Sequence, residues 1–169
     1  MESLTLAKGE FNVLDKNKKT LIISPTTSYS LGSGLESNSM ANYTAKYLKE
    51  NGFKNCDYKV VGTNVSQTDL QSILASSSEY EQIVVALSNV KTNKYNNSAN
   101  LVKELAKKDL DLVVIALDTP YDLMAYSSNV KNYICVYGYQ KATVIAISKY
   151  LNGEFEASGI LAVNGENFK

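Results

Sequence analysis

The chain has 169 residues with 17 basic and 17 acidic side chains, so its formal net charge is zero. All 17 basic residues are lysines, and the sequence contains no histidine, arginine or tryptophan. These absences exclude Ser-His-Asp and Cys-His relays, histidine-based zinc sites and bidentate arginine clamps.

The composition fits one folded domain without a membrane span. Domains usually contain about 100–150 residues, and 44% hydrophobic with 20% charged residues is ordinary for a globular protein. The balanced charge argues against nucleic acid and anionic membranes as partners. The longest apolar runs, such as residues 112–117, are far shorter than the roughly 20 residues of a bilayer span. The first residues do not resemble a signal peptide, and the compartment stays unknown.

Five short runs rich in β-branched residues predict strands. In chain order they are Thr20–Ser24, Cys56–Val61, Gln82–Leu87, Asp111–Leu117 and Asn132–Tyr137. Three of these runs are almost continuously apolar, which is typical of strands that are covered on both faces in a parallel sheet.

Helical periodicity separates these strands. The expected helices run from about Ser39 to Asn51, over Gln67–Ala75 after the cap Ser66, over Asn97–Lys108 and over Gln140–Leu151. This alternation predicts an α/β fold, a three-layer αβα sandwich around a mostly parallel sheet of five or six strands. We expect residues 1–18 to be a linker-like N-terminal segment and residues 19–169 to form a single α/β domain.

Two cysteines, Cys56 and Cys135, fall in predicted strands. Their separation does not match metal-ligand spacing, and free cysteines are among the most buried residue types. We therefore expect two buried thiols and neither a metal site nor a cofactor. A disulfide between them is the lesser alternative.

The loops that follow the strands are the candidate sites, because ligands gather beyond the carboxyl ends of parallel strands. The first, Pro25–Asn38, lacks the spacing of a phosphate-binding loop, so we interpret it as a surface loop. The most unusual is Asp118-Thr-Pro-Tyr-Asp122, whose carboxylates could serve acid–base or glycosyl chemistry about 5–10 Å apart. The alternative is local, with Asp118 as a helix cap, Pro120 at the first helical position and Asp122 in the first turn.

Tyrosines gather around the same region, at positions 121, 126, 133, 137 and 139. Exposed tyrosines stack on sugar rings and are enriched at interfaces, whereas core packing is the commoner role. The candidates for substrate binding or for a domain interface are therefore Asp118, Tyr121, Asp122, Tyr137 and Tyr139. No residue is assigned as catalytic.

Several motifs occur in a characteristic order along nearly the whole chain. An apolar strand from Val113 leads into Asp118-Thr-Pro-Tyr-Asp-Leu123, and Tyr137-Gly-Tyr139, Leu151-Asn-Gly-Glu154 and Ser158-Gly-Ile-Leu-Ala-Val163 follow. With the opening segment Ser3–Lys8, this order resembles the C-terminal domain of family 3 glycoside hydrolases. The resemblance is greatest to the bacterial β-N-acetylhexosaminidase branch.

The resemblance implies that the catalytic residues lie elsewhere. In that family the nucleophilic Asp, and in this branch an Asp-His dyad, belong to an N-terminal (β/α) barrel. Other branches place an acid/base Glu on the loop after the third strand of the second domain. The corresponding loop here, Ser88–Asn97, contains no carboxylate. Ala162 also departs from the proline that is usual in the family tail.

The sequence supports three hypotheses. The first is an accessory domain of a family 3 glycosidase, which hydrolyses O-glycosyl bonds, with this chain inactive alone and supporting the sugar site of a separate barrel. The second is a freestanding carbohydrate-binding or protein-interaction module, and the third a small α/β enzyme or flavodoxin-like ligand binder. The first hypothesis makes the barrel the partner, with a sugar or a homodimer through the barrel-facing surface as further candidates. It also predicts an exposed apolar or tyrosine-bearing patch.

Overall fold

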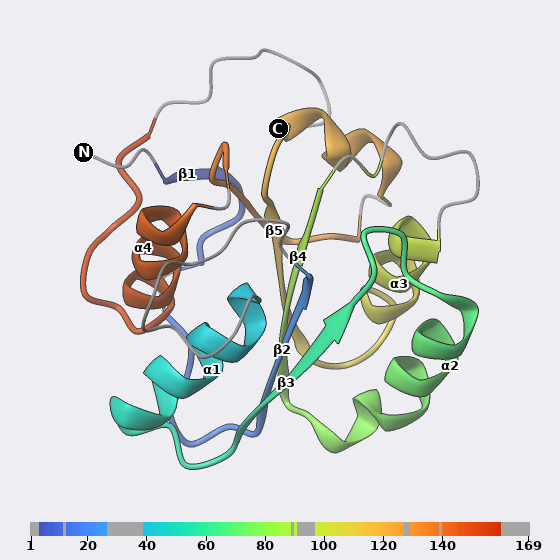
Figure 1. The fold of residues 1–169 in the computed structure, drawn as a ribbon, viewed down its shortest axis with the longest axis horizontal. Helices are drawn as coiled ribbons and strands as arrows, with labels where there is room; N and C mark the ends of the chain where they lie inside the picture. The colour runs from blue at the N-terminus through green and yellow to red at the C-terminus, as the bar shows by residue number, and fades with distance from the viewer. Residues whose placement is uncertain are drawn as a thin grey trace.

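A computed structural model describes residues 4–11, 13–26, 39–88, 90, 97–126, 129–138 and 140–159. Six strands form one mixed sheet in the order β1-β6-β5-β4-β2-β3 (Figure 1). Their bounds are β1 Thr5–Lys8, β2 Thr20–Pro25, β3 Cys56–Val61, β4 Gln82–Leu87, β5 Asp111–Ala116 and β6 Asn132–Cys135. β2 to β6 pair in parallel, and β1 pairs antiparallel with β6. The predicted α/β fold with a mostly parallel sheet is confirmed.

Helices cover both faces of the sheet, with α1 and α4 on one face and α2 and α3 on the other (Figure 1). They are α1 Met40–Glu50, α2 Gln67–Ser76, α3 Asn97–Leu105 and α4 Lys141–Leu151. The described residues also include the 3-10 helices η1 Ser77–Glu79 and η3 Pro120–Ala125. Side chains alternate between the two layers, so that Ile22 packs with α1 and α4 while Ile23 packs with α2 and α3. This alternation explains why the central strands are apolar throughout.

Two helices begin where the sequence predicts, α1 after Ser39 and α2 after the predicted cap Ser66. The Ser39 hydroxyl accepts a hydrogen bond from the Asn42 N–H at 3.2 Å, and the Ser66 hydroxyl accepts one from the Asp69 N–H at 3.0 Å. α3 ends at Leu105, three residues before the predicted end. β5 and β6 also end earlier than expected, at Ala116 and Cys135.

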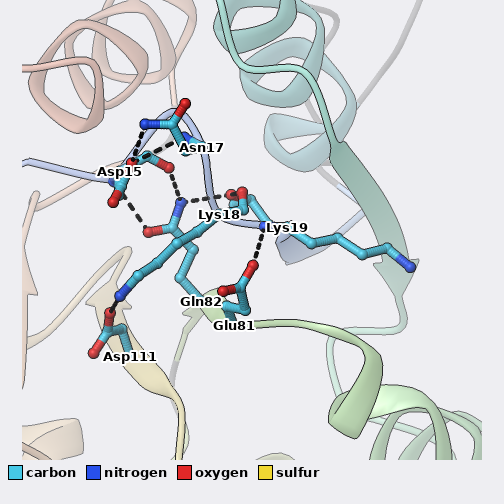
Figure 2. Close-up of polar contacts among 8 residues, drawn as sticks. Asp15, Asn17, Lys18, Lys19, Glu81, Gln82 and Asp111 are labelled. Carbon is cyan, nitrogen blue, oxygen red and sulfur yellow. Dashed lines mark hydrogen bonds and ion pairs between the residues drawn. The ribbon is translucent and has the colours of Figure 1, made fainter.

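The N-terminal segment is tied to the sheet. β1 extends the sheet beyond β6, and Leu4 and Leu14 are buried. Figure 2 shows the Gln82 side chain at the amino end of β4, turned toward Asp15. Its amide oxygen accepts from the Asp15 N–H at 3.1 Å, and its amide nitrogen donates to the Asp15 carbonyl at 2.8 Å and to the Thr20 hydroxyl at 2.6 Å. Within the segment 1–18 that we expect to be linker-like, Thr5–Lys8 therefore forms an edge strand of the sheet. The domain boundary at residue 18 stays a prediction.

Both cysteines have free, buried thiols, as expected. Burial raises the pKa of each thiol to about 12. Neither is therefore ionised near neutral pH, and neither is poised as a nucleophile. Within the described ranges, no helix has both the length and the apolar character needed to cross a membrane.

Candidate functional site at the carboxyl edge of the sheet

The sequence-predicted residues follow the carboxyl ends of two neighbouring strands. Ala116 of β5 pairs with Cys135 of β6, and the Val136 N–H donates to the Ala116 carbonyl at 3.0 Å. Because the strands are in register, Asp118 and Tyr137 leave the sheet at the same level. Tyr139 and most of the loops Pro25–Asn38 and Ser88–Asn97 lie outside the described residues.

The turn after β5 is capped by Thr119 and not by Asp118. The Thr119 hydroxyl accepts a hydrogen bond from the Tyr121 N–H at 3.3 Å. Pro120 is the first residue of η3 and Asp122 lies in its first turn, where a carboxylate suits the helix dipole. The local interpretation of this cluster is therefore correct for Pro120 and Asp122, and the cap belongs to the neighbouring residue.

The two carboxylates of this turn lie in different environments. Asp118 is exposed, whereas Asp122 is 1% exposed. The Asp122 charge adds to burial in raising the pKa values of Tyr126, Tyr133 and Cys135. Because Asp122 is closed off from solvent, Asp118 is the one carboxylate of this turn that a sugar could reach, and one carboxylate does not make the pair that glycoside hydrolysis needs, so we assign neither a catalytic role.

Two of the clustered tyrosines belong to the core. Tyr133 is buried, and its hydroxyl donates to the Pro120 carbonyl at 3.3 Å. The Tyr126 ring meets it edge-on, with the centroids 6.1 Å apart. Burial raises the pKa of both phenols, so both stay protonated and anchor η3 on β6.

Three large apolar side chains at this edge face solvent, and we call them the carboxyl-edge patch. Tyr121 is 46% exposed, Met124 50% and Tyr137 43%. In a 3-10 helix, side chains three residues apart lie on one face, so η3 presents Tyr121 and Met124 together. Sequence reasoning missed Met124, although this spacing from Tyr121 would have found it once the turn was known to be a 3-10 helix.

Tyr137 has a backbone φ of 52°. A left-handed conformation costs an aromatic residue roughly 1–2 kcal/mol. Among the described non-glycine residues, Tyr137 is the one with a positive φ. Strain of this kind gathers at functional sites, where the surrounding structure maintains it. Tyr137 lies just beyond the end of β6, in the turn that leads into α4.

The described residues offer no site for a metal ion. No group of three or more Cys, Asp or Glu side chains among them is close enough to hold one. The exposed side chains of the carboxyl-edge patch suit contact with an apolar or aromatic surface.

The chain is similar to part of several larger glycosidases of known structure. It aligns with a glycoside hydrolase family 3 β-N-acetylglucosaminidase from Paenibacillus sp. str. FPU-7 with a TM-score of 0.77 and 25% identity, over 94% of this chain and 30% of that one. A fungal multi-domain β-N-acetylglucosaminidase of the same family matches with a TM-score of 0.66 and 20% identity, over 91% of this chain and 17% of that one. A β-glucosidase from Listeria innocua matches with a TM-score of 0.65 and 16% identity, over 93% and 24%.

No protein-family model matches the sequence, and no curated protein matches it. The structural matches confirm the resemblance to family 3 glycoside hydrolases. This chain spans less than a third of the length of the three enzymes just described. That share fits the C-terminal α/β domain of such an enzyme without its barrel.

Proposed function

We propose that this chain is the accessory domain of a family 3 glycosidase of the β-N-acetylhexosaminidase type. In this proposal a separate (β/α) barrel carries the catalytic residues, and the carboxyl-edge patch packs against it beside the sugar site. The observation that carries the proposal is the match to the Paenibacillus β-N-acetylglucosaminidase, which covers 94% of this chain but only 30% of that enzyme.

The chemistry of the chain supports an accessory role. The sequence has no histidine, and the loop Ser88–Asn97 has no carboxylate, so neither known form of the proton donor is present. Of the two carboxylates at this edge, Asp122 is buried and only Asp118 is accessible to a sugar. One accessible carboxylate can complete the wall of a neighbouring site but does not supply an acid–base pair.

The exposed side chains support the placement of the interface. A monomer rarely leaves large apolar side chains together at the surface without a function. Tyr121, Met124 and Tyr137 belong to two segments that leave adjacent strands. Tyrosine and methionine are enriched in the cores of protein interfaces, so this patch suits a partner surface better than bulk water.

A domain exchange tests the proposal. In the Paenibacillus enzyme, the region that this chain matches is replaced by this chain, and hydrolysis of an aryl N-acetylglucosaminide is measured. We expect the hybrid to exceed the enzyme that lacks the region altogether, and the isolated chain to show no turnover. Serine substitutions at Tyr121, Met124 and Tyr137 should remove the gain, whereas Tyr58→Ser, at an equally exposed tyrosine on β3, should keep it. Turnover by the isolated chain that is lost in Asp118→Asn or Asp122→Asn would contradict the proposal.

The alternative is a freestanding carbohydrate-binding or protein-interaction module, and the exposed patch is the observation that favours it. Such a module would bury the patch against a second copy or a sugar. Sedimentation of the isolated chain tests the homodimer, because a dimer through the patch dissociates in Met124→Asp. A monomer whose mass is unaffected by Met124→Asp excludes the homodimer, and the domain exchange then separates a sugar-binding module from the accessory domain.

A further inference from the structure

A surface hollow lies at the far end of α4 from the carboxyl-edge patch. Tyr137 precedes the start of α4, whereas this hollow lies around the end of α4. Its lining combines Tyr150 and the residues after the helix with Leu6, Phe11 and Val13 of the N-terminal segment. Eleven helical residues span about 16 Å, so the two surfaces are separate. The hollow has a volume of about 470 Å³, within the range of about 300–1,000 Å³ that small-molecule sites occupy.

Three aromatic rings form one side of this hollow, from the N-terminal segment, from α4 and from the segment after α4. Tyr150 lies at the centre, with its ring centroid 5.6 Å from that of Phe11 and 5.9 Å from that of Phe155. The Tyr150 hydroxyl donates to the Phe11 carbonyl at 3.3 Å. Tyr150 is buried, whereas Phe155 is exposed and offers its ring to a ligand.

Two further contacts fix the walls before any ligand arrives. The Leu14 N–H donates to the Leu151 carbonyl at 3.1 Å, which ties the N-terminal segment to α4. Gly153 has a φ of 81°, and a Cβ there would meet the Val13 Cγ2 at 2.8 Å. Glycine is therefore required for this close approach. A preformed site of this kind loses little conformational entropy on binding.

The polar groups of the hollow select the class of ligand. Its lining includes the Asn152 amide and the Glu156 carboxylate among the rings, and no lysine. The absence of a basic group from the described walls disfavours an anion. The Asn152 side-chain nitrogen donates to Glu154 at 2.9 Å, and its buried oxygen accepts no hydrogen bond from the residues that the structure describes. Because that oxygen is closed off from solvent, the exposed Glu156 carboxylate is the acceptor that the hollow offers to a ligand hydroxyl.

We propose that this hollow binds one or two units of a neutral sugar. The apolar face of a pyranose ring stacks on Phe155, and its hydroxyl groups donate to the Glu156 carboxylate. An aromatic face combined with a carboxylate suits a molecule that has both C–H faces and hydroxyl groups. The choice of a sugar over another hydroxylated ring rests on the proposed function. The site would give an accessory domain a sugar contact remote from the barrel interface.

The test is a titration of the full 169-residue chain with N-acetylglucosamine, N,N′-diacetylchitobiose and cellobiose, followed by amide NMR shifts. We expect saturable shifts at Gly153, Phe155 and Ala157 with a Kd in the millimolar range. Phe155→Ala should weaken binding about tenfold, since stacked aromatic pairs are worth about 0.5–1.5 kcal/mol beyond the area they bury. Tyr58→Ala removes an exposed tyrosine from β3 and should leave the Kd unchanged.

Phe155 lies at the surface, so its substitution should preserve the fold. Glu156→Gln keeps the shape of the wall and should weaken binding about threefold by removing a charged acceptor. The absence of saturable shifts at these amides up to about 50 mM of all three sugars, or an unchanged Kd in Phe155→Ala, would overturn the proposal. Shifts centred on Tyr121 and Tyr137 would overturn it too. Failure here is distinguishable from failure of the proposed function, because the domain exchange depends on the carboxyl-edge patch and not on Phe155.

Discussion

At the scale of single residues, the side-chain amide of Gln82 takes the place that a peptide group of a neighbouring strand would have beside Asp15. Its side-chain amide pairs with the Asp15 backbone through both an N–H and a carbonyl, as a peptide group in a sheet would. A third hydrogen bond joins it to Thr20. Gln82 is 2% exposed; its bond to Thr20 is buried, and its two bonds to Asp15 are partly buried.

Gln82→Ala should therefore destabilise the fold by about 2–4 kcal/mol. It removes the partner of the Asp15 backbone groups, at about 1–2 kcal/mol in all because water can reach these partly buried groups, and the cavity it opens adds a similar amount. Urea unfolding measures the change. Gln67→Ala, at the exposed first residue of α2, is the matched control and should cost less than about 0.5 kcal/mol. Equal losses in both variants would show that the Asp15 pairing contributes nothing specific.

The strained backbone of Tyr137 makes a second prediction. Asparagine tolerates a left-handed conformation, whereas a β-branched residue does not. We expect Tyr137→Val to be less stable than Tyr137→Asn by about 1–2 kcal/mol. Thermal and urea unfolding of the two variants provide the comparison. Equal stabilities would mean that the turn relaxes and that no strain is stored at this residue.

Two carboxylates with lowered pKa values make the stability of the fold depend on pH in the acid range. Lys59 and Ser66 lower the pKa of Asp69 below its ordinary 3.8, and Tyr47 and Asn152 lower the pKa of Glu154 below its ordinary 4.5. Because the folded state holds these pKa values below those of the unfolded chain, both groups stabilise it above about pH 4.5. That contribution is lost as the pH falls through the folded pKa values.

Asp69→Asn combined with Glu154→Gln should flatten the fall in stability below pH 4.5. The measurement is the urea midpoint between about pH 2 and pH 7. Glu50→Gln, at an exposed glutamate of α1, controls for the loss of negative charge and should retain the steep fall. An unchanged acid profile in the double variant would assign the fall to other groups.

At the scale of elements, local signals predicted most of the fold and non-local contacts account for what was missed. Ser66 predicts the start of α2 because a cap acts within three residues of itself, and Ser39 caps α1 in the same way. β1 has no such signal, since its pairing partner β6 lies more than 120 residues away in the sequence. The location of the candidate residues at the carboxyl edge could be predicted, because they follow the predicted strands directly. The exposure of Met124 could not, because it depends on a 3-10 helix that hydrophobic periodicity does not distinguish from other turns.

Removal of residues 1–18 tests whether β1 is part of the domain. The truncation exposes the edge of β6, removes the buried Leu4 and Leu14 and deletes the Asp15 partner of Gln82. We expect a loss of at least about 4 kcal/mol, since burying each large apolar side chain contributes about 1.5–3 kcal/mol. A chain that lacks only residues 1–3 is the control. Unchanged stability on removing residues 1–18 would confirm a linker-like segment.

At the scale of the whole molecule, one sheet separates two hydrophobic layers, and each layer contains one cysteine. Cys56 packs in the layer with α1 and α4, and Cys135 packs in the layer with α2 and α3. The strands supply alternate residues to both layers, as Val84 and Val85 do. One layer cannot lose its packing without disturbing the strands that support the other, so we expect the two layers to unfold together.

The two thiols can measure this coupling. Both thiols are buried, with a pKa of about 12, so the folded chain should react with a disulfide reagent at pH 8 only through unfolding. In Cys56→Ala and Cys135→Ala, the remaining thiol reports on one layer alone. We expect each thiol to become reactive at the urea concentration at which that variant loses its circular dichroism signal. A thiol that reacts well before that midpoint would show that its layer opens separately, and that the sheet does not couple the two faces.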